Sequence, residues 1–300
     1  MRRVSAVDGM LLGTVLLWAL NTTVSKYVLT HGWAPLSYGV IRYFLAIGLF
    51  WIFTGWRERS FRIARSDWRL VALCSGTIFV NQLCFVYAVK FTTASTVALM
   101  FGTTPVFVGV LTVAIGLERL GRRFWTAALV TFVGVALVAL GSGGSFSGST
   151  KGVLLALGGA VTWAVYSMAV APLMQRYSPF RISSIVLALG WLPLAAVGSS
   201  QVAAQEFSFS ALTWTGFVYA VIGPLFLTNL LWFTAIDRVG PARASLFANL
   251  QPFFAVFFAL ILLSEHLHGL EIAGGILIFA GIALERVRIP LTRAPETPVE

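Results

Sequence analysis

A single arginine lies inside an otherwise apolar stretch of this sequence, and its charge is the first candidate for chemistry. Arg42 stands about seven residues, roughly 10 Å, inside the apolar segment 36–54. A charge at that depth costs free energy and is usually paired or functional. The acidic residues lie at the ends of apolar segments or between them, so we expect no carboxylate beside Arg42. Its guanidinium could bind a substrate carboxylate, or it could bond backbone carbonyls or extend outward along its stem.

Polar and aromatic side chains in the first apolar segment form a second candidate group. Thr14, Trp18, Asn21 and Ser25 are spaced by four, three and four residues, which places them on one face of a helix. Such a face points either into a cavity or against a neighbouring helix, and the sequence leaves both open. Lys26 is expected to extend its ammonium group toward water.

Several further residues could line a binding cavity or else hold neighbouring helices together. They are Asn81, Tyr87, Phe101, Asn229 and Asn249. Asn81 and Gln82 are adjacent and cannot share a helical face, so at most one of them lines a cavity. Pro105 and Pro252 interrupt backbone hydrogen bonding within apolar segments, and we expect them to act as hinges or as fixed bends.

The sequence lacks the motifs of the common enzyme classes. His266 and His268 supply two ligands, which do not make a metal site. Cys74 and Cys84 lie ten residues apart in one expected helix and cannot form a disulfide. There is no glycine-rich loop for ATP phosphates. We therefore expect no metal, no cofactor and no enzymatic activity.

The elements that must position these residues are membrane-spanning helices. The chain has 300 residues, of which 58% are hydrophobic and 11% charged, against about 25% charged in soluble domains. Ten segments approach the roughly 20 apolar residues that a span requires. They are 9–29, 36–54, 69–89, 93–115, 124–141, 152–173, 182–199, 213–235, 243–263 and 269–287. The fold class is thus an all-α integral membrane protein with ten spans.

The basic residues predict the orientation of these spans. If the N-terminus is cytoplasmic, 17 lysines and arginines fall on the inner side and only Lys90 and Lys151 on the outer side. Positive charge accumulates on cytoplasmic loops, so both termini are expected in the cytoplasm. The expected location of the protein is the inner membrane of the cell. The charges are scattered over short loops, which argues against a nucleic-acid partner.

An internal repeat divides the chain into two halves. A constant offset of 147 residues relates Pro105 to Pro252, Glu118 to Glu265 and Gly134 to Gly281. Residues 1–145 and 146–288 each hold five spans, and a disordered cytoplasmic tail, 289–300, follows. Because five is odd, the second half must enter the membrane inverted, which places a substrate cavity between the halves. The two glutamates are expected to cap helices or to pair with loop arginines.

The repeat also brings two second-half aromatic residues into the candidate site. Trp18 and Trp163 are related by an offset of 145 residues, so Trp163 and Tyr166 are the counterparts of Trp18 and Asn21. Counterparts in an inverted repeat tend to face one central cavity. We therefore expect these four side chains to line it.

These residues resemble the drug/metabolite transporter superfamily, and within it the ten-span EamA-type branch. The matching residues are Trp18 to Asn21, Ile41 to Tyr43, Ala94 and Ser95, Pro105 to Phe107 and Glu118 to Leu120, with the echoes Ala164, Pro252 and Glu265. The resemblance covers nearly the whole chain and implies a basket-like bundle with a central cavity and the export of metabolites. Within this branch, the overall sequence pattern resembles that of the aromatic amino-acid exporters. One departure is that Asn21 corresponds to Tyr166 in the second half.

The sequence therefore predicts an exporter of small amphipathic metabolites, including aromatic amino acids, that works by alternating access. Arg42 or Asn21 would hold the polar end of the substrate, and no central carboxylate is available to carry a proton. Nucleotide-sugars, phosphate esters and drug-like compounds remain alternatives, as does a scaffold or an intramembrane enzyme. The expected partners are the substrate and membrane lipids; the oligomeric state is open, and a monomer is compatible with the sequence.

Overall fold

The computed structural model describes residues 6–116, 121–141, 149–228, 230–232, 234–235 and 250–286, and these residues form helices with short connections and no strand. The first half contains α1 (Ala6–Thr30), α2 (Pro35–Arg57), the short helix η1 (Arg65–Asp67), α3 (Trp68–Phe91), α4 (Ala94–Phe101), α5 (Thr104–Ala114) and α6 (Arg122–Gly141). The second half contains α7 (Ser149–Met174), α8 (Pro179–Ala203), α9 (Ala211–Val221), the π-helix η2 (Ile222–Leu227), α11 (Gln251–Leu262) and α12 (Gly269–Arg286).

Many of these helices are long and apolar enough to cross a membrane. Within the described residues, seven segments meet that criterion: Val7–Thr30, Pro35–Arg57, Arg65–Phe91, Ala94–Leu111, Thr150–Met174, Pro179–Ala203 and Ala211–Trp232. Two shorter apolar helices, Phe253–Leu262 and Gly269–Gly281, follow. The chain is a multi-pass membrane protein, while the count of ten spans stays a prediction.

Local sequence sets where several helices begin. The side chains of Thr93, Ser178 and Ser210 accept hydrogen bonds from the backbone N–H three residues later, and each precedes the first residue of α4, α8 or α9. Such caps satisfy backbone donors that a helix leaves free at its start. Pro35 lies at the start of α2, where its missing N–H costs nothing.

The expectation of bends at the two prolines was wrong in its local detail. The fourth predicted span is two helices, because α4 ends at Phe101 and α5 begins at Thr104. Pro105 therefore lies in the first turn of α5, and Pro252 in the first turn of α11. Proline is tolerated in a first turn because no intrahelical hydrogen bond is lost there. A hinge at either position would act at a helix start rather than within a helix.

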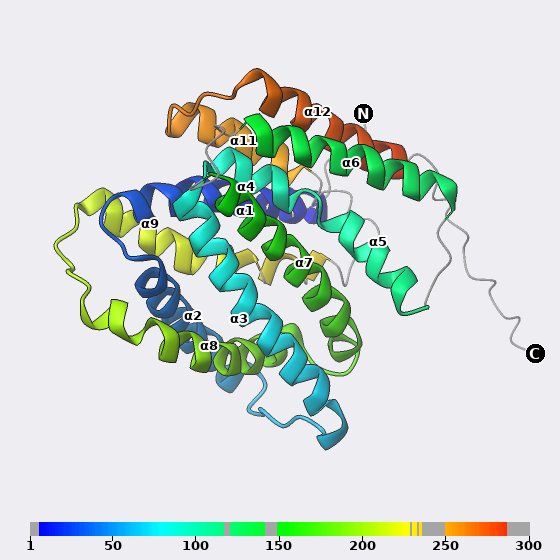
Figure 1. Cartoon of the computed structure of the whole chain (residues 1–300). Helices are drawn as coiled ribbons and strands as arrows, with labels where there is room; N and C mark the ends of the chain where they lie inside the picture. The colour runs from blue at the N-terminus through cyan, green and yellow to red at the C-terminus, as the bar shows by residue number, and fades with distance from the viewer. Residues whose placement is uncertain are drawn as a thin grey trace, which may run out of the picture.

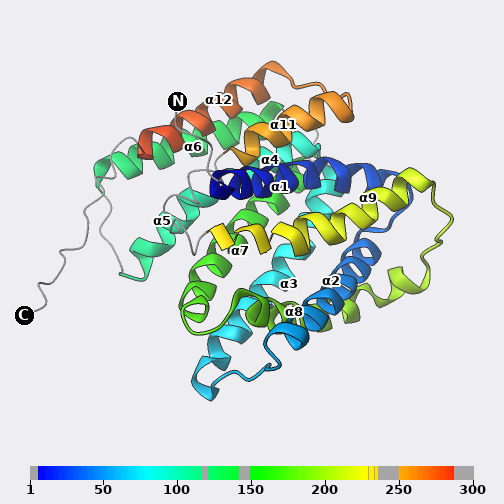
Figure 2. The same ribbon diagram turned by 180° about the vertical axis from the view of Figure 1, so that it is seen from behind.

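The most extensive packing joins the two halves. α6 packs along α12, α3 along α7, α2 along α8, and α1 along α11. Both views show α6 and α12 side by side at one edge of the bundle, with α2 and α8 at the opposite edge (Figures 1 and 2). In the repeat, α9 is the counterpart of α3, and α1 is the counterpart of α7. The structure contains both matching contacts, α3 with α7 and α9 with α1. The arrangement is consistent with a two-fold relation between the halves.

Counterpart helices from the two halves run antiparallel. The indole Nε1 of Trp51, late in α2, donates to the carbonyl of Ser184, early in α8. Gly198, late in α8, lies against Val40 near the start of α2. The same holds for α6 and α12, because the side chain of Arg123 donates to the carbonyl of Leu284.

Glycines allow α6 and α12 to approach closely. A Cβ atom on Gly134 would lie 2.6 Å from the carbonyl oxygen of Gly274, and one on Gly141 would lie 2.8 Å from the backbone nitrogen of Glu271. A Cβ on Gly281 would overlap with Oγ1 of Thr131. Small residues of this kind permit backbone contact between membrane helices.

Candidate functional site

Arg42 is buried in the bundle and is held by neutral side chains of three helices. Its Nη1 donates to the hydroxyl oxygen of Tyr38 at 3.1 Å and lies 3.4 Å from Oδ1 of Asn21. Its Nη2 donates to Oε1 of Gln82 at 3.1 Å. The hydroxyl of Tyr38 also lies 2.7 Å from Oγ of Ser25. Helices α1, α2 and α3 thus converge on the guanidinium group of Arg42, a residue that is 3% exposed.

Aromatic rings surround the same guanidinium. Its Cζ atom lies 4.9 Å from the ring centroid of Tyr38 and 5.6 Å from those of Tyr43 and Phe85. Rings within about 6 Å attract a cation through their quadrupoles. Among the described residues, Arg42 forms no ion pair. Within the described part of the chain, the site therefore carries a positive charge without a counter-ion, lined by aromatic surface.

Two buried nitrogen atoms of the site have no hydrogen-bond partner in the described part of the chain. They are Nε of Arg42 and Nε2 of Gln82. Buried donors in proteins almost always have a partner, so these two atoms are open to an incoming acceptor. Gly39 makes room for Gln82, because a Cβ at that position would lie 3.1 Å from Gln82 Nε2.

Helical spacing explains how the sequence assembles this site. Tyr38 and Arg42 are four residues apart on α2, and Asn21 and Ser25 are four residues apart on α1, where the Ser25 hydroxyl lies 3.3 Å from Asn21 Oδ1. Each helix therefore presents a pair of polar groups to the other. Gln82 completes the site from α3. Arg42 and Asn21, two separate candidates from the sequence, lie next to each other here.

The other predicted residues lie in several different environments. Asn81 donates to the carbonyl of Gly159 at 2.8 Å, which makes it a contact between α3 and α7. Trp18 packs on Trp232 with ring centroids 5.2 Å apart. Trp163 and Tyr166 pack on each other at 5.3 Å. Among the residues that the structure describes, no hydrogen bond or ring contact joins any of these to Arg42, and their predicted role in lining a cavity stays a prediction.

Two further aromatic candidates also lie apart from Arg42. Tyr87 stacks on Phe91, and its hydroxyl accepts a hydrogen bond from Gln201 at 3.2 Å. Phe101 packs edge-to-face on Phe85, with ring centroids 6.1 Å apart. Phe85 in turn lies over Arg42, so Phe101 is one residue removed from the guanidinium. Asn229 and Asn249 lie outside the described residues.

Lys26, near the C-terminal end of α1, does not behave as the sequence suggested, whereas Glu265 does. Lys26 does not extend toward water, because its Nζ donates to the carbonyls of Val89 and Thr92 at 2.9 and 2.8 Å. These carbonyls belong to the C-terminal end of α3, where a cation is favoured. Glu265 accepts from the backbone N–H groups of Ala94 and Ser95, so it caps α4 as predicted. Glu118 lies outside the described residues.

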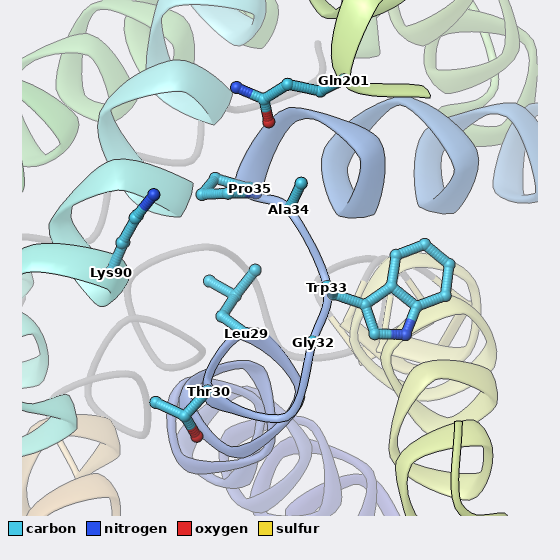
Figure 3. A pocket seen from close by; sticks show the side chains of 8 residues that line it. All are labelled: Leu29, Thr30, Gly32, Trp33, Ala34, Pro35, Lys90 and Gln201. Carbon is cyan, nitrogen blue, oxygen red and sulfur yellow. The ribbon is translucent and has the colours of Figure 1, made fainter. Parts of the chain in front are cut away.

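A hollow of about 350 Å³ opens beside the connection between α1 and α2. Leu29, Thr30, Gly32, Trp33, Ala34, Pro35, Lys90 and Gln201 line it. In Figure 3 the ammonium group of Lys90 points toward Pro35, and Gln201 lies on the far side of the chain from Leu29. The ring of Trp33 points away from Lys90. Trp33 and Tyr38 pack edge-to-face with centroids 6.2 Å apart, so one aromatic contact separates the hollow from the partners of Arg42.

Sequence reasoning missed two residues that contact Arg42, namely Tyr38 and Gln82, and one residue beside the hollow, Trp33. Tyr38 lies one helical turn before Arg42, and that spacing could have identified it. For Asn81 and Gln82 the sequence left open which of the two lines a cavity, because nothing in the sequence says which face of α3 meets α2. Trp33 lies in a connection outside any expected span, where no helical periodicity applies.

Comparison with known proteins identifies the fold and the family. The sequence model of the EamA-like transporter family matches residues 6–140 and, a second time, residues 150–285. A solved crystal structure shares the fold with a TM-score of 0.61 at 18% identity, covering 94% of this chain and 97% of the other.

Relatives of this chain have similar lengths and low identities. A probable amino-acid metabolite efflux pump of Salmonella typhimurium is 26% identical and covers 93% of this chain and 94% of its own length. A probable terminal-alkyne amino-acid exporter of Streptantibioticus cattleyicolor is 28% identical over 77% of this chain and 78% of its own. An uncharacterized transporter of Archaeoglobus fulgidus is 25% identical over 90% and 94%. With two copies of the family module spanning nearly its whole length, the chain belongs to the EamA-like transporter family.

Proposed function

We propose that this transporter exports small amphipathic metabolites that carry a carboxylate, with amino acids, including aromatic ones, as the main class. The observation that carries the proposal is the buried guanidinium of Arg42, held by neutral acceptors and facing no acidic group among the described residues. A carboxylate would neutralise this charge and accept from its free Nε, and arginine is well suited to such paired bonds. The surrounding rings would hold an apolar side chain. Two relatives are named for amino-acid metabolites or an amino acid, which agrees with this class.

Alternating access between two inverted halves is the mechanism that we propose for it. The antiparallel packing of counterpart helices, α2 on α8 and α6 on α12, supports the inversion. Because Arg42 is almost completely buried here, a substrate reaches it only after helices separate. The basic residues favour cytoplasmic termini, and we propose outward transport because two relatives are named as an efflux pump and as an exporter.

The alternative substrates fit the described site less well. A phosphate ester or nucleotide-sugar would require several cations, but Lys26 is engaged with the C-terminal carbonyls of α3. A drug-like cation would require a carboxylate, and the described neighbours of Arg42 are neutral. We also propose transport without proton coupling, so a pH gradient across proteoliposomes should leave the rate unchanged; a strong dependence would contradict this.

The experiment is counterflow of labelled amino acids into proteoliposomes, paired with thermal-shift binding on purified protein. Arg42→Met keeps the volume and removes the charge. We expect at least about tenfold weaker binding and a matching loss of counterflow, because a hydrogen bond to a charged group contributes about 1.5–3 kcal/mol. Arg69→Ala is the control, since Arg69 is exposed and remote from the site. If Arg42→Met folds normally and transports like the parent, the carboxylate site is wrong.

A further inference from the structure

The connection between α1 and α2 is tied to the second half of the chain by two glutamine side chains. Oε1 of Gln205 accepts from the backbone N–H of Ala34 at 2.9 Å, and its Nε2 donates to the carbonyl of Gly32 at 3.2 Å. Oε1 of Gln201 accepts from the backbone N–H of Leu36 at 2.9 Å. Both glutamines lie at the C-terminal end of α8 or directly after it. Each bond thus joins the first half to the second at one end of the bundle.

An aromatic side chain from the same connection is inserted between rings of the second half. Trp33 is 2% exposed and lies parallel to Phe217 and Phe209, with ring centroids 4.4 and 4.9 Å away. Phe207 and Trp214 contact it edge-on at 5.8 Å each. We call Trp33 and these four rings the aromatic box. Withdrawing Trp33 would expose a large aromatic surface, so the box holds the connection closed.

Tyr38 touches both the aromatic box and the substrate-binding charge. Its ring packs edge-on against Trp33 at 6.2 Å and Phe217 at 6.0 Å. Its hydroxyl is shared between Oγ of Ser25 and Nη1 of Arg42. The side chain is completely buried. Any movement of Arg42 away from Tyr38 therefore removes one of the two hydroxyl contacts that fix the ring against Trp33.

We propose that residues 31–36 form the outer gate of the transport pathway and that Tyr38 is the positioning residue that connects its opening to occupancy of Arg42. This inference rests on the proposed function, which supplies the carboxylate and the outward orientation. The carboxylate draws the guanidinium of Arg42 toward itself, Nη1 leaves the Tyr38 hydroxyl, the ring loses that anchor, and Trp33 packs less tightly. The glutamine bonds then break, and the segment moves away from α8. The hollow beside Lys90 lies directly against this segment, so the gate opens toward it (Figure 3).

The gate itself can be tested without any substrate. Ala34→Cys places a thiol on the segment in a background where Cys74 and Cys84 are replaced by alanine, and its maleimide labelling rate in detergent reports opening. Gln205→Ala removes the two hydrogen bonds to Gly32 and Ala34 of the segment and should raise the labelling rate about fivefold or more. Glu206→Gln changes the exposed neighbouring side chain and should leave the rate as in the parent. An unchanged rate in Gln205→Ala, with retained thermal stability, overturns the gate.

The role of Tyr38 is tested in the same background with Tyr38→Phe, which keeps the ring and removes only the hydroxyl. We expect faster labelling without ligand and no further increase on adding L-phenylalanine, whereas the parent responds to L-phenylalanine with faster labelling. Binding of L-phenylalanine is measured in parallel, because Tyr38→Phe also removes one hydrogen-bond partner of Arg42 while Asn21 and Gln82 remain. Parental labelling in Tyr38→Phe overturns the connection. If the parent binds no amino acid while Gln205→Ala still labels faster, the proposed substrate fails and the gate stands.

Discussion

The guanidinium of Arg42 offers five N–H donors, and the described residues supply three acceptors for two of its nitrogens. None of these acceptors carries a charge, so burial of the cation is offset by neutral hydrogen bonds and by rings alone. Leaving a buried charge without a counter-ion costs several kcal/mol, which the protein tolerates where an incoming ion supplies the difference. At the scale of a single residue, a carboxylate bound as proposed would therefore stabilise the site.

This reasoning predicts opposite effects on stability and on binding when a carboxylate is built into the site. Gln82→Glu places an acid beside Nη2 of Arg42, where the amide oxygen now lies at 3.1 Å. We expect a melting temperature equal to or above that of the parent, because the ion pair compensates the buried charge. Amino-acid binding should weaken at least about tenfold, because the built-in carboxylate competes for the guanidinium. Thermal unfolding with and without L-phenylalanine measures both.

The adjacent residue provides the control for that substitution. Asn81→Asp also adds an acid to α3, but Asn81 contacts Gly159 and Thr162 on α7 rather than Arg42. Its amide donates in both contacts, so an aspartate there should lower the melting temperature without a ligand-specific effect. If Gln82→Glu binds amino acids as the parent does, Arg42 is a structural cation and not the docking point.

Arg42 could be found from the sequence because a charge inside an apolar segment is conspicuous whatever the tertiary structure. Gln82 could not, because its importance depends on how α3 is rotated about its own axis. The rule that adjacent residues cannot share a face was informative: Asn81 contacts α7 and Gln82 contacts Arg42. Which of the two would face the charge is a property of helix packing, which single-sequence periodicity does not contain.

At the scale of elements, the glycine spacing of α6 and α12 and the positions of the prolines had different predictive value. Gly134 and Gly141 lie seven residues apart, or two helical turns, as do Gly274 and Gly281, and this spacing predicts close packing. In the structure the backbones of Gly134 and Gly274 lie against each other. A glycine repeat has only one common use on a membrane helix, so the inference was direct. A proline has several, and the sequence around Pro105 did not distinguish a bend within a helix from the start of a new one.

The α6–α12 contact predicts a large cost for one added methyl group. A Cβ on Gly274 would lie 2.5 Å from the carbonyl oxygen of Gly134 and 2.8 Å from the backbone nitrogen of Val138. Backbone atoms cannot move aside as a flexible side chain does, so Gly274→Ala should destabilise the protein by about 1–3 kcal/mol. The melting temperature in detergent should fall by several degrees.

Gly76→Ala is the matched control for this substitution, because a Cβ there meets nothing within 4 Å. It also replaces a glycine in a helix interior by alanine, and it should leave the melting temperature unchanged or slightly raised. Equal melting temperatures for the two variants would show that α6 and α12 do not pack with this geometry in the membrane.

At the scale of the whole molecule, both ends of the bundle are held by side-chain contacts between the halves, and their chemistry differs. At the end where α2 finishes, Glu58 pairs with Arg181, and Asp67 pairs with Arg176. At the opposite end, neutral glutamines and the aromatic box hold the connection between α1 and α2. Salt screens ion pairs, though less where a partner is buried as Asp67 is, whereas the amide and ring contacts have no net charge to screen. A transporter that opens its two ends alternately would thus respond to salt at one end more than at the other.

The inversion of the halves makes a prediction about the sidedness of two matching connections. Residues 58–67 follow the second predicted span of the first half, and residues 204–210 follow its counterpart in the second half. Inverted halves place these connections on opposite sides of the membrane, whereas parallel halves would place them on the same side. Ala64→Cys and Ser208→Cys put an exposed thiol on each, again with Cys74 and Cys84 replaced by alanine. With cytoplasmic termini, an impermeant maleimide added to intact cells should label Ser208→Cys at once and Ala64→Cys only after permeabilisation. Labelling of both from the same side would contradict the inverted repeat, and the reversed pattern would contradict the orientation while leaving the inversion intact.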